Sequence, residues 1–283
     1  MTEFFFTPAQ KQRLVELGAE PSDLEKSFKS EVEREDGFNE TANVLTKKNV
    51  NNIKDFLCWK KRPFIRELED KLRNAAIKLD FSEVITPTII PKSFIEKMSI
   101  SEKDPLWNQI IWVGKNRALR PMLAPSLYVI MTRLRGLVRP VRIFEIGQCF
   151  RLDTKGPKHL EEFTMLNMVE LAPEEDGLKD RLLGYIDAMM GSIDLDYTTS
   201  VESSEVYGET IDVMVKGIEV ASAAIGPKPI DVNWGVCEPW IGVGFGLERL
   251  AMLAGGYSSV ARVSRSLSYL DGSRLDVIKL ITE

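Results

Sequence analysis

The chain has few of the residues that metal centres and disulfide frameworks need. Its 283 residues include one histidine and three cysteines. The cysteines Cys58, Cys149 and Cys237 lie far apart and form no C-x-x-C pair, so their spacing suggests neither a zinc site nor a disulfide framework. We therefore expect a reducing compartment, and a cytoplasmic location.

Long apolar runs are also missing. The opening Met1-Thr-Glu-Phe-Phe-Phe has no basic segment, and no stretch of about 18 uninterrupted apolar residues follows. Both features argue against a secretory signal and against a transmembrane helix. With 44% apolar and 28% charged residues, the chain can bury one large core, or one core with a small appendage.

The chain carries no strong excess of one charge. A net charge of −5 provides no global basic field for nucleic acid. The charges are nevertheless uneven, because residues 20–40 hold eight acids and three bases whereas residues 47–78 hold ten bases and four acids. The basic segment indicates a polyanionic partner, and a solvated helix face is the alternative.

The order of the expected elements indicates the fold class. Residues 1–56 are typical of two or three short helices, with polar breaks at 18–21 and 36–37. A helical stripe of apolar residues follows Pro63 as far as Leu79, and hairpins dominate the remainder. This pattern predicts an α+β fold with a mostly antiparallel sheet flanked by helices. The further elements expected are strands at 81–86, 109–113, 118–122, 141–152, 162–171, 197–202, 205–215 and 218–225, and a helix at 125–135.

Alternate glycines near the C-terminus, Gly242-Val-Gly-Phe-Gly246, lead directly into a helix-forming segment that contains Arg249. Glycine lets a backbone approach a ligand closely, and an arginine in a first helical turn can share a phosphate with free N–H groups. A dinucleotide fingerprint does not fit, because its third glycine position falls on Leu247 or Arg249. An ordinary strand-to-helix turn with close packing stays open as an alternative.

A second arginine, Arg151, ends the strand expected at 141–152. Burying an unpaired guanidinium on a sheet is costly, so Arg151 and Arg249 together indicate an anionic ligand.

Three segments, in this order, resemble the motifs of class II aminoacyl-tRNA synthetases. Several others resemble the pyrrolysyl-tRNA synthetase family in particular, and the similarity extends from about Asn52 to Leu275. The three motifs are Leu79-Asp-Phe-Ser-Glu-Val-Ile-Thr-Pro87 with Pro91, Phe150-Arg151 through His159-Leu-Glu-Glu-Phe163, and Gly244 to Arg249. The family matches are residues 120–125, 162–167, 206–208, 239–242, 261–262 and 266–272.

The resemblance implies ATP-dependent ligation of pyrrolysine, or a related lysine derivative, to a tRNA through an aminoacyl-adenylate. It implies that Arg151 binds the α-phosphate and the incoming carboxyl group, and that Arg249 and His159 bind the γ-phosphate. Phe163 would stack on the adenine, with Arg249 on its other side. The remaining residues that it places in the ATP site are Asp153, Leu160, Glu219 and Ser222, the last two as ligands of Mg²⁺.

One position departs from the family. The second motif usually reads Arg-x-Glu, whereas this chain has Asp153, one methylene shorter. We expect ATP to bind through a shifted loop or a water.

The resemblance also implies a deep pocket for a bulky lysine derivative. Asn167 would donate its amide to the carbonyl of the substrate side chain, and Tyr207 would close over the pocket as a lid. Some of the apolar members could instead be ordinary core residues. The other pocket residues are Ala124, Leu127, Tyr128, Met131, Val169, Ala224 and Trp240.

For the whole chain, we expect residues 1–56 to form a helical extension that contacts tRNA and residues 57–283 to form the class II catalytic domain. We expect a homodimer built on the first motif, in a form without the family's separate N-terminal tRNA-binding domain. Two alternatives stay open. One is a class II synthetase or carboxylate-activating paralogue for another amino acid, and the other is a non-catalytic paralogue that binds tRNA.

Overall fold

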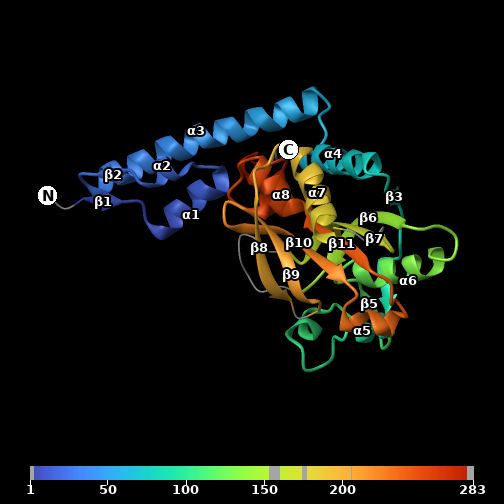
Figure 1. Ribbon diagram of the computed structural model, residues 1–283. Helices are drawn as coiled ribbons and strands as arrows, with labels where there is room; N and C mark the ends of the chain where they lie inside the picture. Colours follow the sequence, from blue (N-terminus) through green and yellow to red (C-terminus); the bar gives the residue numbers. More distant parts are fainter. Residues whose placement is uncertain (1–2, 153–159, 174–176, 205, 279–283) are drawn as a thin grey trace. The chain divides into compact units, whose positions relative to one another are not determined.

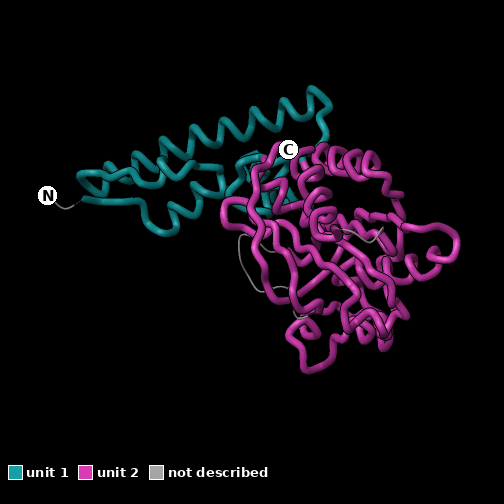
Figure 2. Tube along the Cα trace, viewed as in Figure 1, with its two compact units in different colours: residues 1–64, 255–283 teal, residues 65–254 magenta. Residues whose placement is uncertain are grey.

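The computed structural model describes residues 3–152, 160–173, 177–204 and 206–278 (Figure 1). Two compact units make up the chain, one of residues 1–64 with 255–283 and one of residues 65–254 (Figure 2). None of the helices in the described ranges is long and apolar enough to cross a membrane. The predicted α+β class is confirmed.

A seven-stranded sheet forms the centre of the larger unit. Its strand order is β3-β6-β7-β11-β10-β9-β8, and all neighbouring strands are antiparallel except β3 and β6. The long hairpin predicted from residue 141 to residue 171 is confirmed. The strands are β3 (Ser82–Glu83), β6 (Val141–Phe150), β7 (Glu162–Leu171), β8 (Thr198–Ser204), β9 (Gly208–Val215), β10 (Ile218–Gly226) and β11 (Trp240–Gly246).

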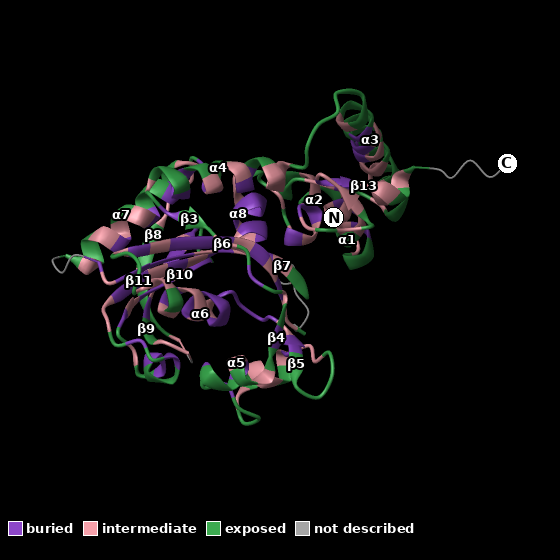
Figure 3. Cartoon of the chain, turned by 90° about the vertical axis from the view of Figure 1, so that its right-hand side faces the viewer, coloured by how far each residue is buried: buried purple, intermediate pink, exposed green. Residues whose placement is uncertain are grey.

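Helices cover both faces of this sheet, with α7 and α8 on one side and α6 on the other (Figure 3). On the α6 side, Tyr128 and Met131 belong to the same buried apolar cluster as Val169 of β7. On the opposite side, Arg181 of α7 pairs with the fully buried Glu170. The helices of this unit are α4 (Phe64–Lys78), α5 (Lys92–Lys97), α6 (Ala124–Leu134), α7 (Leu178–Gly191) and α8 (Leu247–Ala254), with 3-10 helices η1 (Pro105–Gln109) and η2 (Pro229–Trp234).

The hairpin predicted between 109–113 and 118–122 is present in part. An antiparallel bridge joins Trp112 to Ala118, and the N–H of Leu119 donates to the carbonyl of Ile111 at 2.9 Å. The longer ladder of β5 (Arg117–Leu119) is with β4 (Ile89–Pro91), a pairing that was not predicted. The rings of Trp107 and Trp112 pack with centroids 4.9 Å apart, and residues 105–109 curl into η1. The first predicted strand is therefore shortened, because Gln109 belongs to η1.

The smaller unit contains one long helix where short ones were expected. Helix α3 (Glu31–Cys58) runs through the break predicted at Asp36-Gly37. A Cβ atom on Gly37 would lie 2.4 Å from the ring of Phe28, so this glycine makes room for a packed ring within a helix. The other predicted break is confirmed, since Gly18 ends α1 (Pro8–Leu17) with φ +93°. The remaining elements are β1 (Phe4–Phe5), α2 (Pro21–Leu24), β2 (Ser27–Phe28), η3 (Val260–Arg262), β12 (Tyr269–Leu270), β13 (Ser273–Arg274) and η4 (Leu275–Val277).

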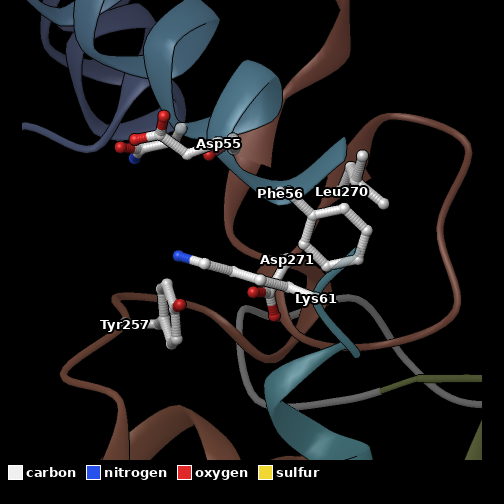
Figure 4. A pocket seen from close by; sticks show the side chains of 8 residues that line it. Asp55, Phe56, Lys61, Tyr257, Leu270 and Asp271 are labelled. Carbon is white, nitrogen blue, oxygen red and sulfur yellow. The ribbon is translucent and has the colours of Figure 1, made fainter. Parts of the chain in front are cut away.

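A polar cavity of about 180 Å³ also lies in the smaller unit (Figure 4). The Lys61 side chain extends into it between Asp55 and Tyr257. None of the predicted site residues lines this cavity. Its lining residues are Asn52, Asp55, Phe56, Lys61, Tyr257, Leu270, Asp271 and Ser273.

Candidate active site

The register of the central sheet places several predicted site residues in one row. Asn167 of β7 pairs with Gly244 of β11, Gly244 pairs with Ser222 of β10, and Ser222 pairs with Asp212 of β9. Directly paired residues point to the same face of a sheet. The neighbouring row on the same face contains Val169, Gly242 and Ala224.

The alternate glycines of β11 keep the middle of this face free of side chains. A Cβ atom on Gly244 would lie 3.1 Å from both terminal atoms of Asn167. A Cβ atom on Gly242 would lie 3.1 Å from the carbonyl oxygen of Met168 and 3.4 Å from the ring of Trp240. Close packing therefore accounts for glycine at these two positions, and it leaves bare backbone in the middle of both rows.

Arg151 and Phe163 form a stacked pair at the end of the β6–β7 hairpin. The guanidinium carbon of Arg151 lies 5.3 Å from the centroid of the Phe163 ring, within the range of a cation–π contact. The Nε atom of Arg151 donates to the backbone carbonyl of Pro121 at 2.8 Å. Phe163 pairs with Cys149, and Arg151 follows Cys149 by two residues, so all three side chains point to the same face of the sheet. This is the face that carries Asn167 and the alternate glycines, and the two contacts orient the guanidinium there.

Arg249, in the first turn of α8, meets Glu219 at the start of β10. Its Nη1 atom donates to the backbone carbonyl of Glu219 at 3.0 Å and lies 3.8 Å from Oε2 of the same residue. Burial raises the pKa of the Glu219 carboxyl group, Arg249 and Arg151 oppose that shift, and Asp212 adds to it. Both predicted anion-binding arginines therefore act on one carboxylate.

The residues around Glu219 fit a magnesium ion that is held together with phosphates. A bulge between Glu219 and Ala221 shifts the strand by one residue, so Glu219 can share a face with Ser222 despite their odd spacing. Ser222 Oγ donates to Asp212 Oδ1 at 2.7 Å. The part of the chain that the structure describes contains no group of three or more His, Cys, Asp or Glu side chains suited to a metal. Magnesium usually takes one or two carboxylates, several waters and substrate phosphates, which this donor set permits.

The predicted amino-acid pocket forms one apolar cluster under α6. The ring of Tyr207 packs edge-on against Trp240 with centroids 5.7 Å apart, and its hydroxyl group interacts with that of Tyr128. The Oδ1 atom of Asn167 is buried and has no hydrogen-bond partner among the described residues. A substrate amide offers both a carbonyl and an N–H, so it can pair with either end of the Asn167 amide. The cluster contains all the other pocket residues, which are Ala124, Leu127, Met131, Val169 and Ala224.

Three more residues were predicted to belong to the ATP site. Asp153 and His159 lie outside the described residues. Leu160 is described and is half-buried just before β7.

Sequence reasoning missed several polar residues that support the site. Asp212 was missed because only the strand register brings it beside Ser222. Arg120 was quoted in a family match without a role, and it is buried against Glu145 at 2.7 Å and Thr86 at 3.0 Å. It precedes Pro121, whose carbonyl orients Arg151. Asp231, the third, accepts hydrogen bonds from two pocket residues.

Comparisons with known proteins agree with this geometry. Residues 60–225, more than half of the chain, match the family model described as the phenylalanyl tRNA synthetase beta chain CLM domain. The phenylalanine–tRNA ligase alpha subunit of Methanospirillum hungatei is 27% identical over 137 residues, which is 45% of this chain and 27% of that protein. The histidine–tRNA ligase of Methanocaldococcus jannaschii is 31% identical over 114 residues, 39% of this chain and 27% of that protein. The chain thus spans about a quarter of the length of these relatives.

Solved structures show a much fuller match. A crystal structure of pyrrolysyl-tRNA synthetase from Desulfitobacterium hafniense superposes with a TM-score of 0.90 and 42% identity, over 96% of this chain and 98% of that one. A second structure of a pyrrolysyl-tRNA synthetase from the same organism gives a TM-score of 0.89 and 41% identity over the same shares. The chain belongs to the pyrrolysyl-tRNA synthetase family of aminoacyl-tRNA ligases.

Proposed function

We propose that the chain activates pyrrolysine with ATP and transfers it to its tRNA through an aminoacyl-adenylate. One observation carries the proposal: Arg249 contacts Glu219, and Arg151 lies on the same sheet face, which also carries Asn167. This juxtaposition suits a reaction between two anions, and the apolar cluster under α6 lies on the same face. The similarity to the Desulfitobacterium hafniense enzyme supports the same reaction.

In the activation step the amino-acid carboxylate attacks the α-phosphorus of ATP, and the bond to pyrophosphate breaks. Arg151 would hold both reacting groups and stabilise the charge that develops between them. Arg249 and His159 would bind the γ-phosphate of a bent ATP. Phe163, already stacked with Arg151, would pack on the adenine, beside Leu160 and Asp153.

Magnesium would neutralise phosphate charge during this step. Glu219 and Ser222 would be its protein ligands. Asp212 would hold Ser222 in place, as its 2.7 Å hydrogen bond indicates.

The amino-acid pocket would select its substrate by apolar fit and by one amide contact. Leu127, Tyr128, Met131 and Trp240 are buried and supply a wide apolar wall. A small or charged amino acid would leave Asn167 without its partner, and unmet polar contacts discriminate strongly.

The transfer step requires tRNA. We assign tRNA contacts to the helical extension of residues 1–56, with residues 57–283 as the catalytic domain. Phosphate contacts need only a local basic segment, and residues 47–78 supply one despite the net charge of −5. tRNA charging would place the protein in the cytoplasm.

We also propose a homodimer built on the first motif. Ile85 in that motif is 92% exposed, and Ile77 and Ile89 on either side of it are exposed as well. Light scattering should give twice the chain mass, and Ile85→Asp should lower it towards the mass of one chain. A wild-type protein that stays monomeric at all concentrations would contradict the dimer.

ATP–pyrophosphate exchange tests the activation step. Pyrrolysine and a lysine acylated on its side-chain nitrogen should support exchange, whereas phenylalanine, histidine and unmodified lysine should not. Exchange with phenylalanine alone would favour the other-synthetase alternative. No exchange with any amino acid would favour a non-catalytic paralogue.

A further inference from the structure

Asp231 is a fully buried carboxylate in the 3-10 helix η2, with an exposed fraction of 0%. One oxygen accepts a hydrogen bond from the Tyr128 hydroxyl at 2.5 Å. The other accepts from the indole N–H of Trp240 at 2.6 Å and from the backbone N–H of Lys228 at 2.5 Å. Within the described ranges Asp231 forms no ion pair, so these three donors compensate its burial.

Two of the donors are walls of the proposed amino-acid pocket and come from different elements. Tyr128 lies on α6 and Trp240 begins β11. The ring of Tyr128 also stacks on Trp234 of η2, with centroids 5.1 Å apart and an interplanar angle of 9°. Helix η2 therefore holds Tyr128 by both its ring and its hydroxyl group.

The proposed lid residue contacts the same two walls. Tyr207 packs on Trp240, and its hydroxyl group interacts with that of Tyr128. The Tyr128 hydroxyl group donates its proton to Asp231. Burial raises the pKa of both phenols, which keeps both protons in place at neutral pH.

We infer that Asp231 is the positioning residue of the amino-acid pocket. By holding Tyr128 and Trp240, it fixes the surface on which the Tyr207 ring and the substrate side chain bind. Asp231 itself touches no substrate, and its role rests on the proposed function.

The variant Asp231→Asn tests this role because it keeps the shape of the side chain. In the wild type each carboxylate oxygen accepts one of the two side-chain hydrogen bonds, from Tyr128 or from Trp240. The asparagine amide has only one oxygen in place of these two, so one of the two bonds is lost. We expect the KM for the acylated lysine in pyrophosphate exchange to rise on the order of tenfold. The KM for ATP and the kcat should stay within about twofold, because the nucleotide contacts are untouched.

Glu170→Gln is the matched control. Glu170 is also 0% exposed, and it accepts from Arg142, Arg181 and Tyr185 on the opposite face of the sheet. Its replacement should lower the melting temperature without changing the KM for the lysine derivative. If Asp231→Asn leaves that KM unchanged, or changes all three kinetic constants together as a general loss of structure would, the positioning role is excluded.

Two further measurements test the positioning role of Asp231 separately from the proposed function. Asp231→Asn combined with Tyr128→Phe should raise the KM by less than the product of the single effects, since both act through one hydrogen bond. In ¹H–¹⁵N spectra, the indole N–H of Trp240 should exchange faster with solvent in Asp231→Asn than in the wild type. A wild type without exchange activity would refute the proposed function alone, whereas an unchanged Trp240 signal would refute the hold of Asp231 on the pocket.

Discussion

Arg249 and Glu219 bind each other at the edge of the proposed nucleotide site, through a 3.0 Å hydrogen bond to the Glu219 carbonyl and a 3.8 Å approach to its carboxylate. In the proposed reaction the arginine binds phosphate and the carboxylate binds magnesium. Nucleotide binding would therefore replace one protein ion pair with two ligand contacts. Breaking this ion pair costs little free energy, because the side chains of Arg249 and Glu219 are 30% and 48% exposed and solvent screens their charges.

Glu219→Gln should raise the magnesium concentration needed for half-maximal exchange by about tenfold or more. Titration of pyrophosphate exchange with MgCl₂ measures this, and Glu202→Gln on the exposed strand β8 should have no effect. Equal magnesium requirements in the wild type and Glu219→Gln would remove Glu219 from the metal site.

The same variant tests a pH effect. Burial raises the pKa of Glu219, so as the pH falls its carboxyl group takes up a proton before an ordinary glutamate does. The wild-type magnesium requirement should therefore increase on acidification just above the usual glutamate range. Glu219→Gln should lack that increase. The raised pKa also means that ionised Glu219 destabilises the fold at neutral pH, and this effect disappears as the pH falls through its folded-state pKa.

Arg151→Ala should reduce pyrophosphate exchange by at least about 100-fold, since it removes the cation at the reacting phosphate. The melting temperature should stay within about 2 °C of the wild type, because the contacts with Pro121 and Phe163 are few among the many that hold the hairpin. The exposed Arg133 is the control, and its alanine variant should keep full exchange. Retained exchange in Arg151→Ala would show that another residue binds the α-phosphate.

Asn167→Ala should raise the KM for the acylated lysine by about tenfold to hundredfold. Its Oδ1 atom is buried and unpaired among the described residues, so the substrate amide is the expected partner. Asn233→Ala, which changes an exposed amide bonded to Lys97, should leave the KM unchanged. An unaltered KM in Asn167→Ala would place the amide contact elsewhere.

Two helical glycines should respond in opposite ways to replacement by alanine. A Cβ atom on Gly184 in α7 meets nothing within 4 Å, so Gly184→Ala should stabilise the protein by about 0.5–1 kcal/mol. A Cβ atom on Gly37 in α3 would lie 2.4 Å from Phe28, so Gly37→Ala should destabilise it by about 1–3 kcal/mol. Thermal and urea unfolding measure both changes. A stabilising Gly37→Ala would mean that the Phe28 ring moves aside without loss of packing.

The sequence predicted what depends on local pattern. Strand-forming residues on either side of a turn segment predicted the β6–β7 hairpin, because both signals are local to the chain. It could not predict Asp231 or Asp212, because their partners come from strand register and from helix packing far along the chain. It misjudged Gly37 for a related reason, since the space that this glycine leaves is filled by Phe28 from another element.

Strand β11 fixes a length in the proposed active site. Its seven residues run from Trp240 in the amino-acid pocket to Gly246, next to the helix that carries Arg249, and a strand of this length spans about 20 Å. A hydrogen-bonded strand in the middle of a sheet cannot stretch. In the proposed reaction, every accepted amino acid would therefore place its carboxylate at the same point near Arg151. Differences in the length of the substrate side chain would then be accommodated entirely at the Trp240 end. The strand would thus fix the distance between the phosphate site and the amino-acid pocket.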